Sequence, residues 1–276
     1  MCCNLVLTKL KDIIMDRIIY DSLQVREIFH LEFLRWLGRK VKAEYYALKG
    51  GANLRFFFNS FRYSEDIDLD VSNIRVDALR DIVMQILNNQ SFQAILSPFG
   101  IERIIPPDMA KAKQTETTQR FKAHLITTGG EDLFTKVEFS RRGRTAGKVI
   151  VGAVSDSILR VYKLPPLLVP HYDIQSVVIQ KITALSDRAI LQARDVFDIY
   201  ALSSQCGHLK RGDIKVDKEK LKKAREGILE VSFEQFRDTV ISYLSREDQA
   251  GYNTPSSWDE VKLKALNFID ESIKVH

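Results

Sequence analysis

Two nearby segments decide the fold of this 276-residue chain: Leu48-Lys49-Gly50-Gly51-Ala52-Asn53-Leu54 and Arg62-Tyr63-Ser64-Glu65-Asp66-Ile67-Asp68-Leu69-Asp70-Val71. In the second segment, acidic and apolar residues alternate from Asp66 onward. This predicts a β-strand in which Asp66 and Asp68 point to one side of a sheet while the residues between them enter the core. Two carboxylates so placed repel each other unless a cation lies between them. Since Mg²⁺ prefers carboxylate and phosphate oxygens, the pair predicts metal-dependent transfer chemistry on a nucleotide.

The diglycine Gly50-Gly51 supplies the other half of this prediction. It follows an apolar run, Tyr45 to Leu48, and precedes a stretch, Ala52 to Phe61, that has the character of a helix. Two residues without side chains let a phosphate approach the backbone, and the free N–H groups at a helix start favour an anion. The spacing matches neither the P-loop nor the dinucleotide-binding pattern. We therefore expect a strand, a turn that holds a triphosphate, and a helix.

Each half of the pattern has a plainer explanation. A diglycine is usually a turn, and acidic residues in a chain with 28% charged residues are usually solvated. The ordered combination of apolar strand, diglycine, short helix and acidic strand is harder to assemble by chance, so it favours the functional interpretation.

At these residues the chain resembles the AbiEii toxin family, a branch of the DNA polymerase β-like nucleotidyltransferase superfamily found in type IV toxin–antitoxin and phage-resistance systems. The similarity rests on three parts of the sequence: Lys49-Gly50-Gly51 with Leu54 and Arg62-x-Ser64-Glu65-Asp66-Ile67-Asp68-Leu69; Lys136-Val137-Glu138-Phe139-Ser140; and Gln180 to Leu185 through Arg188 to Arg194-Asp195-Val196-Phe197-Asp198-Ile199. The matches span about Tyr45 to Leu202. Where the superfamily usually has Gly-Ser, this chain has Gly50-Gly51, so a serine contact to phosphate is missing. The Asn53 amide is a partial replacement, or else a helix-start residue.

The resemblance implies a transferase that moves a nucleoside monophosphate from a nucleoside triphosphate to an RNA, such as the 3′ end of tRNA, or to a protein hydroxyl. It implies Mg²⁺ or Mn²⁺ as cofactor, and a cognate antitoxin as a possible partner. The residues expected to bind the nucleotide are Lys49, Gly50, Gly51, Asn53, Arg62, Ser64, Lys181, Asp195 and Asp198. The expected catalytic residues are Asp66, Asp68, Glu138 and Lys181, of which the three acids also bind metal.

Glu138 lies in the alternating segment Leu133 to Phe139, which predicts a strand with Glu138 and Lys136 on the same face. In the resembling fold a neighbouring strand supplies a third carboxylate. We expect Glu138 to be a general base toward the acceptor hydroxyl or a ligand of a second metal ion. The alternative is a cross-strand salt bridge between Glu138 and a lysine.

Lys181 lies on the apolar stripe of a predicted helix, seven residues after Ile174 and four after Val177. An ammonium that faces inward is costly unless an anion meets it. The resemblance favours a phosphate. Asp195 and Asp198 on the following helix are the alternative partners, and Arg194 and Asp198 have the spacing of an i,i+4 pair.

The composition, with 45% hydrophobic residues, permits a proper core. A net charge of +5 and a pI near 9.0 allow an RNA partner without requiring one. Basic residues form three clusters, each of which is either a solvated face or a nucleic-acid contact. They are Arg141-Arg142-x-Arg144; Lys111 and Lys113 with Arg120 and Lys122; and Lys218 to Lys223 with Arg225.

The three cysteines, Cys2, Cys3 and Cys206, have neither the spacing of a zinc site nor that of a disulfide framework, which fits a reducing cytoplasm. The sequence has no apolar run of about 18 residues and no secretory signal pattern. We expect a cytoplasmic protein without a membrane span.

The predicted fold class is α+β, with a nucleotidyltransferase-like mixed sheet, flanking helices and a C-terminal helical bundle. Two N-terminal helices are expected within Leu5 to Leu37, with a break near Tyr20-Asp21-Ser22. The remaining expected elements are a helix over 76–88, strands over 99–105, 120–127 and 133–140, and helices over 173–187, 193–204, 217–230, 233–245 and 256–273. Pro165-Pro166 and Pro170 mark the expected junction between a domain over 1–165 and a helical bundle over 166–276.

A different class of function stays open on these residues. As the second hypothesis, the missing serine reflects lost catalysis in a nucleotidyltransferase fold that acts as a binding or interaction module through its helical half.

Overall fold

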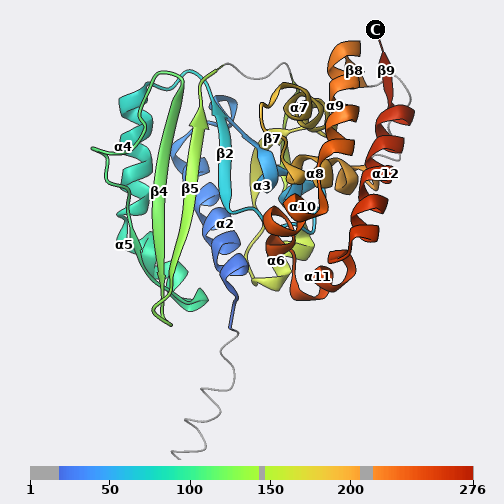
Figure 1. The fold of residues 1–276 in the computed structure, drawn as a ribbon. Helices are drawn as coiled ribbons and strands as arrows, with labels where there is room; N and C mark the ends of the chain where they lie inside the picture. The colour runs from blue at the N-terminus through green and yellow to red at the C-terminus, as the bar shows by residue number, and fades with distance from the viewer. Residues whose placement is uncertain (1–18, 143–146, 206–213, 276) are drawn as a thin grey trace, which may run out of the picture.

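The structure, a computed structural model, describes residues 19–142, 147–205 and 214–275. It contains a seven-stranded mixed sheet in the order β3-β4-β5-β2-β1-β7-β6, covered by helices (Figure 1). The predicted α+β class is therefore confirmed. The expected first helix from Leu5, the three cysteines and Arg144 lie outside the described residues.

The elements follow the predicted order, with several additions. The strands are β1 (Tyr46–Lys49), β2 (Asp66–Val71), β3 (Ile101–Ile105), β4 (Thr118–Thr127), β5 (Asp132–Ser140), β6 (Val149–Ala153), β7 (Leu168–Tyr172), β8 (Ile214–Val216) and β9 (Ile273–Val275). The α-helices are α2 (Ser22–Lys40), α3 (Gly50–Phe57), α4 (Val76–Leu87), α5 (Gln90–Leu96), α6 (Asp156–Val161), α7 (Ile174–Asp187), α8 (Ala193–Ser203), α9 (Lys218–Glu230), α10 (Phe233–Thr239), α11 (Arg246–Tyr252) and α12 (Pro255–Ser272). Short 3-10 turns are η1 (Ala43–Tyr45), η2 (Ser97–Phe99) and η3 (Ile241–Tyr243).

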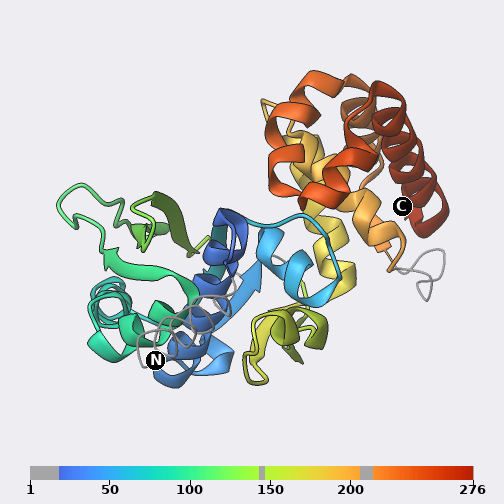
Figure 2. The same ribbon diagram turned by 90° about the horizontal axis from the view of Figure 1, so that it is seen from below.

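Helix α2 shows how local sequence sets an element and then buries it. The Asp21 side chain accepts from the backbone N–H groups of Leu23 and Gln24. The Gln24 side chain in turn accepts from the Asp21 N–H, so a capping box starts the helix. Its residues Ile28, Phe29 and Leu31 are fully buried. The helix packs with α4 and α5 on one face of the sheet, as Figures 1 and 2 show.

The helical half begins later than the prolines predict. β7 lies after Pro165-Pro166, yet it pairs with β6 over five residues and meets β1 through Leu48 and His171, so it belongs to the sheet. The sheet therefore continues past Pro165-Pro166 to Tyr172, and Asp173 caps α7; the division into two domains stays a prediction. A second apolar core joins α7 to α12, and Ala47 and Tyr172 of the sheet contribute to it. Figure 2 shows this helical half beside the sheet half.

None of the helices in the described ranges combines the length and the apolar character that crossing a bilayer requires.

Candidate active site

Strand β2 carries the acidic pair as its sequence predicts. Ile67 and Leu69 are fully buried, whereas Asp66 and Asp68 are partly exposed on the opposite face. β2 lies between β1, to which it is antiparallel, and β5, to which it is parallel. The register places Asp66 beside Lys136 and Asp68 beside Glu138. The strand alternation and this register together bring the three predicted carboxylates to one face of the sheet.

The diglycine turn packs directly against that face. Gly50 has a positive φ of 68°, and a Cβ built on it would stand 2.7 Å from Asp68 Oδ2. A Cβ on Gly51 would stand 2.9 Å from Ser64 Oγ and 3.0 Å from Arg62 Nη2. At Gly50 the positive φ and the crowding both oppose a side chain, whereas at Gly51 a side chain would require Ser64 or Arg62 to shift. The Ser64 hydroxyl occupies the space beside Gly51 that a serine at that position would need.

A lysine lies among the carboxylates. Lys136 Nζ is 3.0 Å from Asp66 Oδ2 and 3.7 Å from Glu138 Oε2, and Arg120 Nε is 2.6 Å from Glu138 Oε2. Burial raises the pKa of Asp68 above its ordinary value; Lys136 opposes this effect, and the charges of Asp66 and Glu138 add to it. The acidic pair is therefore held in a partly buried position where its own charge is unfavourable without a cation.

The donor set fits a divalent cation at Asp66 and Asp68. Asp66 Oδ1 is buried and has no hydrogen-bond partner, and carboxylate oxygens are the ligands that Mg²⁺ prefers. Across the part of the chain that the structure describes, no three Asp, Glu, His or Cys side chains are grouped to hold a metal ion. Glu138 takes part in the salt bridges that were its alternative, and its role as a third metal ligand stays a prediction.

Lys181 faces inward, as its helical stripe predicts, and two carboxylates meet it. Its Nζ is 3.0 Å from Asp195 Oδ1 and 2.6 Å from Asp198 Oδ2. Burial opposes the charge of Lys181, but Asp198 and Asp195 raise its pKa above the ordinary value. The structural pairing weighed as an alternative is therefore present. Lys181 also lines the cavity that contains the acidic pair.

Two arginines complete this ionic cluster. Arg62 donates to both oxygens of Asp198, with Nη2 at 2.9 and 3.0 Å, and Arg188 Nε is 3.2 Å from Asp195 Oδ2. The expected i,i+4 pair of Arg194 with Asp198 is wrong, because Asp198 is fully buried between Arg62 and Lys181 while Arg194 is exposed. Three cations meet two carboxylates in the cluster, so it leaves an excess positive charge facing the cavity.

The cavity of about 350 Å³ at this place joins the two halves of the molecule. Gly50, Gly51, Asp66 and Asp68 line it together with the cations Arg62, Lys181 and Arg188. A neighbouring cavity of about 530 Å³ is also lined by Gly50, Asp68 and Lys181. Its other lining residues include Lys49 of β1 and Gln180 of α7. Two linked spaces therefore meet at the acidic pair, enough for a nucleotide and the group that reacts with it.

Asn53 and Lys49, two further residues expected to bind the nucleotide, also have partners within the protein. Asn53 is fully buried; its Nδ2 donates to the Tyr172 carbonyl, and its Oδ1 is 3.0 Å from His171 Nδ1. Asn53 therefore neither replaces the missing serine nor caps a helix, but fastens α3 to β7. Lys49 Nζ is 2.5 Å from Asp70 Oδ1, so Asp70 partly neutralises the charge of Lys49 within the sheet.

Tyr243 is a cavity residue that sequence reasoning missed. Its hydroxyl donates to Glu65 Oε2 at 2.7 Å, and its carbonyl accepts from the Tyr63 N–H at 2.8 Å. This ties η3 of the helical half to the segment that leads into β2. A tyrosine almost 180 positions away along the chain has no local signal that would reveal such a contact. Lys136, Arg120 and Arg188 were visible as motif or cluster residues, but their places in the cavity were not.

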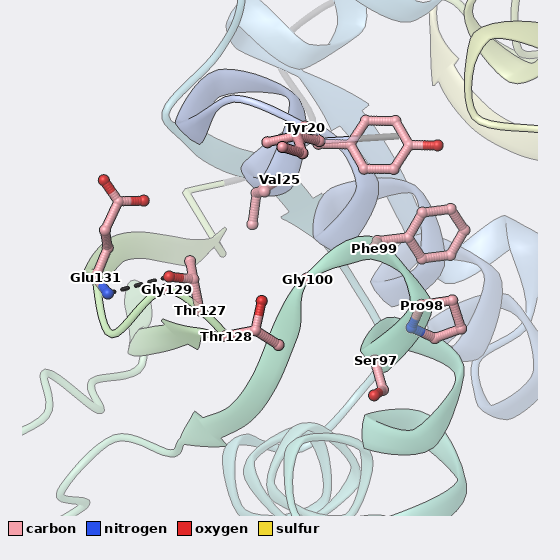
Figure 3. A pocket seen from close by; sticks show the side chains of 11 residues that line it. Tyr20, Val25, Ser97, Pro98, Phe99, Gly100, Thr127, Thr128, Gly129 and Glu131 are labelled. Atoms are coloured by element: carbon pink, nitrogen blue, oxygen red, sulfur yellow. Dashed lines mark hydrogen bonds between the residues drawn. The ribbon is translucent and has the colours of Figure 1, made fainter. Parts of the chain in front are cut away.

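A separate cavity of about 430 Å³ lies at the turn between β4 and β5 (Figure 3). Tyr20 and Phe99 form one side of it, and Glu131 provides the single charged side chain among the described residues that line it. It shares no lining residue with the cavity of the acidic pair, so we assign it no chemistry.

Strand carboxylates packed against a diglycine turn at the start of a helix, with cations lining the same cavity, are the features of a nucleotidyltransferase site. A family model described as nucleotidyl transferase AbiEii toxin, type IV toxin–antitoxin system, matches residues 32–256. The chain belongs to this family of toxins. Comparison with curated protein sequences gives no match.

Among solved structures with a similar fold, two are described as nucleotidyltransferases. MenT4, a nucleotidyltransferase toxin from Mycobacterium tuberculosis H37Rv, is similar with a TM-score of 0.62 and 16% identity, covering 90% of this chain and 84% of that one. A putative nucleotidyltransferase from Helicobacter pylori gives 0.55 and 17%, covering 91% and 95%. JHP933 from Helicobacter pylori gives 0.53 and 18%, covering 92% of each chain. At these identities the similarity concerns the fold alone.

Proposed function

We propose that this nucleotidyltransferase uses Mg²⁺ or Mn²⁺ at Asp66 and Asp68 to transfer a nucleoside monophosphate from a nucleoside triphosphate to a hydroxyl of an RNA or protein acceptor. The observation that carries the proposal is the contact of the Gly50 backbone with the Asp68 carboxylate inside a cavity lined by cations. A triphosphate on the diglycine turn would have its α-phosphate beside the acids. The divalent ion, when bound, would polarise the phosphate oxygens as a Lewis acid.

The reaction needs positioning and charge more than covalent help. The acceptor oxygen bonds to the α-phosphorus, the bond from that phosphorus to the oxygen bridging the α- and β-phosphates breaks, and pyrophosphate leaves. The acceptor proton passes to a carboxylate, for which Glu138 is our candidate because its strand position is in register with Asp68. The backbone at Gly50 and Gly51 holds phosphate oxygens. The Ser64 hydroxyl lines the same cavity but donates to the Asp66 carbonyl at 2.8 Å, and Lys49 lines the neighbouring cavity.

The ionic cluster has two roles in this proposal. Lys181 and Arg188 line the cavity and neutralise the charge that develops on the leaving pyrophosphate. Asp195 and Asp198 hold Lys181 in place, and Arg62 completes the arrangement through Asp198. Asp198 therefore acts on the nucleotide through its partners rather than by contact.

The test uses nucleoside triphosphates labelled at either the α- or the γ-phosphate, incubated with Mg²⁺ and total bacterial RNA and protein. We expect label from the α-phosphate in a macromolecule and none from the γ-phosphate, because pyrophosphate carries the γ-phosphate away. Asp66→Asn and Asp68→Asn should each abolish the transfer. Transfer of γ-label would identify a kinase instead. No transfer, together with no nucleotide binding by calorimetry, would favour the inactive binding module.

The family implies a toxin, so transfer in cells is expected to arrest growth, with a cognate antitoxin as the partner that relieves it. The matched control is Asp68→Asn, which should express without arrest.

A further inference from the structure

The face of the sheet that carries the acids continues across β5 and β4 without a helix over it in the described chain (Figure 1). On both strands, one set of alternate side chains is buried against α2 and the helices beside it, and the other set is at least partly exposed. We call the middle part of this exposed set the β4–β5 face; it consists of Arg120, Lys122, His124, Phe134, Lys136 and Glu138. Ile126, Asp132, Ser140 and the buried Thr118 lie at the strand ends, outside it.

Strand register connects this face to the catalytic acids in two rows. Asp68 lies beside Glu138, which lies beside Arg120. Asp66 lies beside Lys136, which lies beside Lys122. Two strand spacings amount to about 10 Å. A chain that crosses the strands from the acids therefore reaches a basic side chain in either row within that distance.

Beyond the rows lies a basic cavity that begins where the active-site cavity ends. Arg120 lines both of them. This outer cavity, of about 520 Å³, is also lined by Lys111, Lys113, Lys122 and His124. The active site and the basic cavity are thus two parts of one continuous surface.

The charge on this surface is only partly balanced from within. Arg120 is paired with Glu138, Lys111 lies 3.6 Å from Asp108, and the His124 ring meets Asp132. Lys113 and Lys122 are exposed and have no carboxylate within 4.0 Å among the described residues. Two unbalanced ammonium groups beside the path from the active site favour a partner that carries negative charge.

The aromatic ring of Phe134 lies among the cations of this face. Phe134 lies beside His124 across the strands, with the two ring centres 5.7 Å apart, and Lys122 Nζ is 5.8 Å from the Phe134 ring centre. The ring is partly exposed on the same face. Cations that contact phosphates, next to an aromatic ring on which a base can stack, are how proteins hold single-stranded nucleic acid. An acidic protein segment would use the cations but would have no need for the ring.

We propose that the β4–β5 face and the adjoining basic cavity bind the phosphate chain of a single-stranded RNA, whose terminal hydroxyl reaches Asp66 and Asp68. The inference rests on the proposed nucleotidyl transfer, and it selects RNA as the acceptor. Lys113 and Lys122 contact phosphates, and Phe134 stacks on a base near the reacting end.

The experiment measures binding of a fluorescein-labelled RNA of about twelve nucleotides by anisotropy at several salt concentrations, without nucleotide. In Lys113→Gln/Lys122→Gln we expect the slope of log K against log salt to fall by about 1.4, since each lost phosphate contact on a single strand contributes about 0.7. Phe134→Leu should weaken binding about fivefold or more, with an unchanged slope.

The matched control is Lys218→Gln/Lys222→Gln, which removes the same charge from the exposed side of α9. It should bind RNA like the wild type. Calorimetry with a nucleoside triphosphate and Mn²⁺ should give one affinity for all these proteins, because none of the changed residues lies at the acidic pair.

Two results would overturn the inference: an RNA affinity and salt slope that are the same in Lys113→Gln/Lys122→Gln as in the wild type, or α-label recovered on protein rather than on RNA. Failure of the proposed function looks different. In that case the wild type binds no nucleotide and labels no acceptor, whatever its affinity for RNA.

Discussion

The backbone of Gly50 and the carboxylate of Asp68 are in direct contact, so that a Cβ on the glycine would stand 2.7 Å from Asp68 Oδ2. The contact joins the turn after β1 to the strand that carries the acids. It explains why the first residue of the diglycine tolerates no side chain: the crowded atom is a carboxylate oxygen, and φ is positive.

Gly50→Ala should abolish transfer and cost about 1–3 kcal/mol of stability, because the strained φ and the displaced carboxylate act together. Transfer assays and urea unfolding measure the two effects. Gly130→Ala is the control, since Gly130 also has a positive φ, 82°, but has no atom within 4 Å of the added Cβ. It should lose stability and keep its activity. Normal transfer by Gly50→Ala would show that the turn does not position Asp68.

Mg²⁺ or Mn²⁺ should raise the melting temperature of the wild type relative to the same protein in EDTA, and should not do so for Asp68→Asn. In EDTA, Asp68→Asn should be at least as stable as the wild type, because burial raises the pKa of Asp68 and its charge opposes folding. Differential scanning fluorimetry measures both effects. The control is Asp238→Asn, because the Asp238 side chain is exposed. A metal-induced shift that persists in Asp68→Asn would mean that the cation binds elsewhere than at Asp66 and Asp68.

Asp198→Asn should lower the free energy of unfolding by about 3–5 kcal/mol, since it leaves the buried Arg62 and Lys181 short of a counter-charge. The pair of the exposed Asp259 and the partly buried Lys262, whose atoms are 3.0 Å apart, provides the comparison. Asp259→Asn should change stability by less than about 1 kcal/mol. Equal effects in urea unfolding would mean that the buried cluster does not stabilise the fold.

Acid should destabilise the protein in part through His30. The ring is buried, and burial together with the Arg26 charge lowers its pKa to about 3. Below about pH 6.5 the His30 ring is therefore protonated in the unfolded chain but stays neutral in the folded chain, so the free energy of unfolding falls as the pH falls. Between pH 8 and pH 5 the loss is about 2 kcal/mol. His30→Gln should show a correspondingly smaller loss in urea unfolding at the two pH values, and identical losses would contradict a neutral, buried ring.

The sequence predicts those parts of the site whose signals are local. Alternation along β2 places Asp66 and Asp68 on one face, and the apolar stripe of α7 turns Lys181 inward, because strand and helix periods fix side-chain direction. What surrounds those residues depends on contacts between distant segments. The pairing of Lys136 with Asp66 follows from strand register. The buried position of Asn53 follows from its hydrogen bond to the Tyr172 carbonyl of β7.

The same distinction explains the errors in the fold. Pro165-Pro166 correctly marks a break, but the sequence around β7 is short and contains Pro170, so its pairing with β6 carries no local signature. Helix boundaries are nearly right where a cap is visible, as at Asp21 and Asp173. The helix α11 was not expected, since its seven residues are too few to show a period.

The two hydrogen bonds of Tyr243, to Glu65 and Tyr63, make the helical half a brace for the catalytic strand. The brace ends one residue before Asp66. Separating the halves would break these bonds beside Asp66 and would also expose the part of the second core that Ala47 and Tyr172 form, so the width of the cleft and the direction of the acids depend on each other.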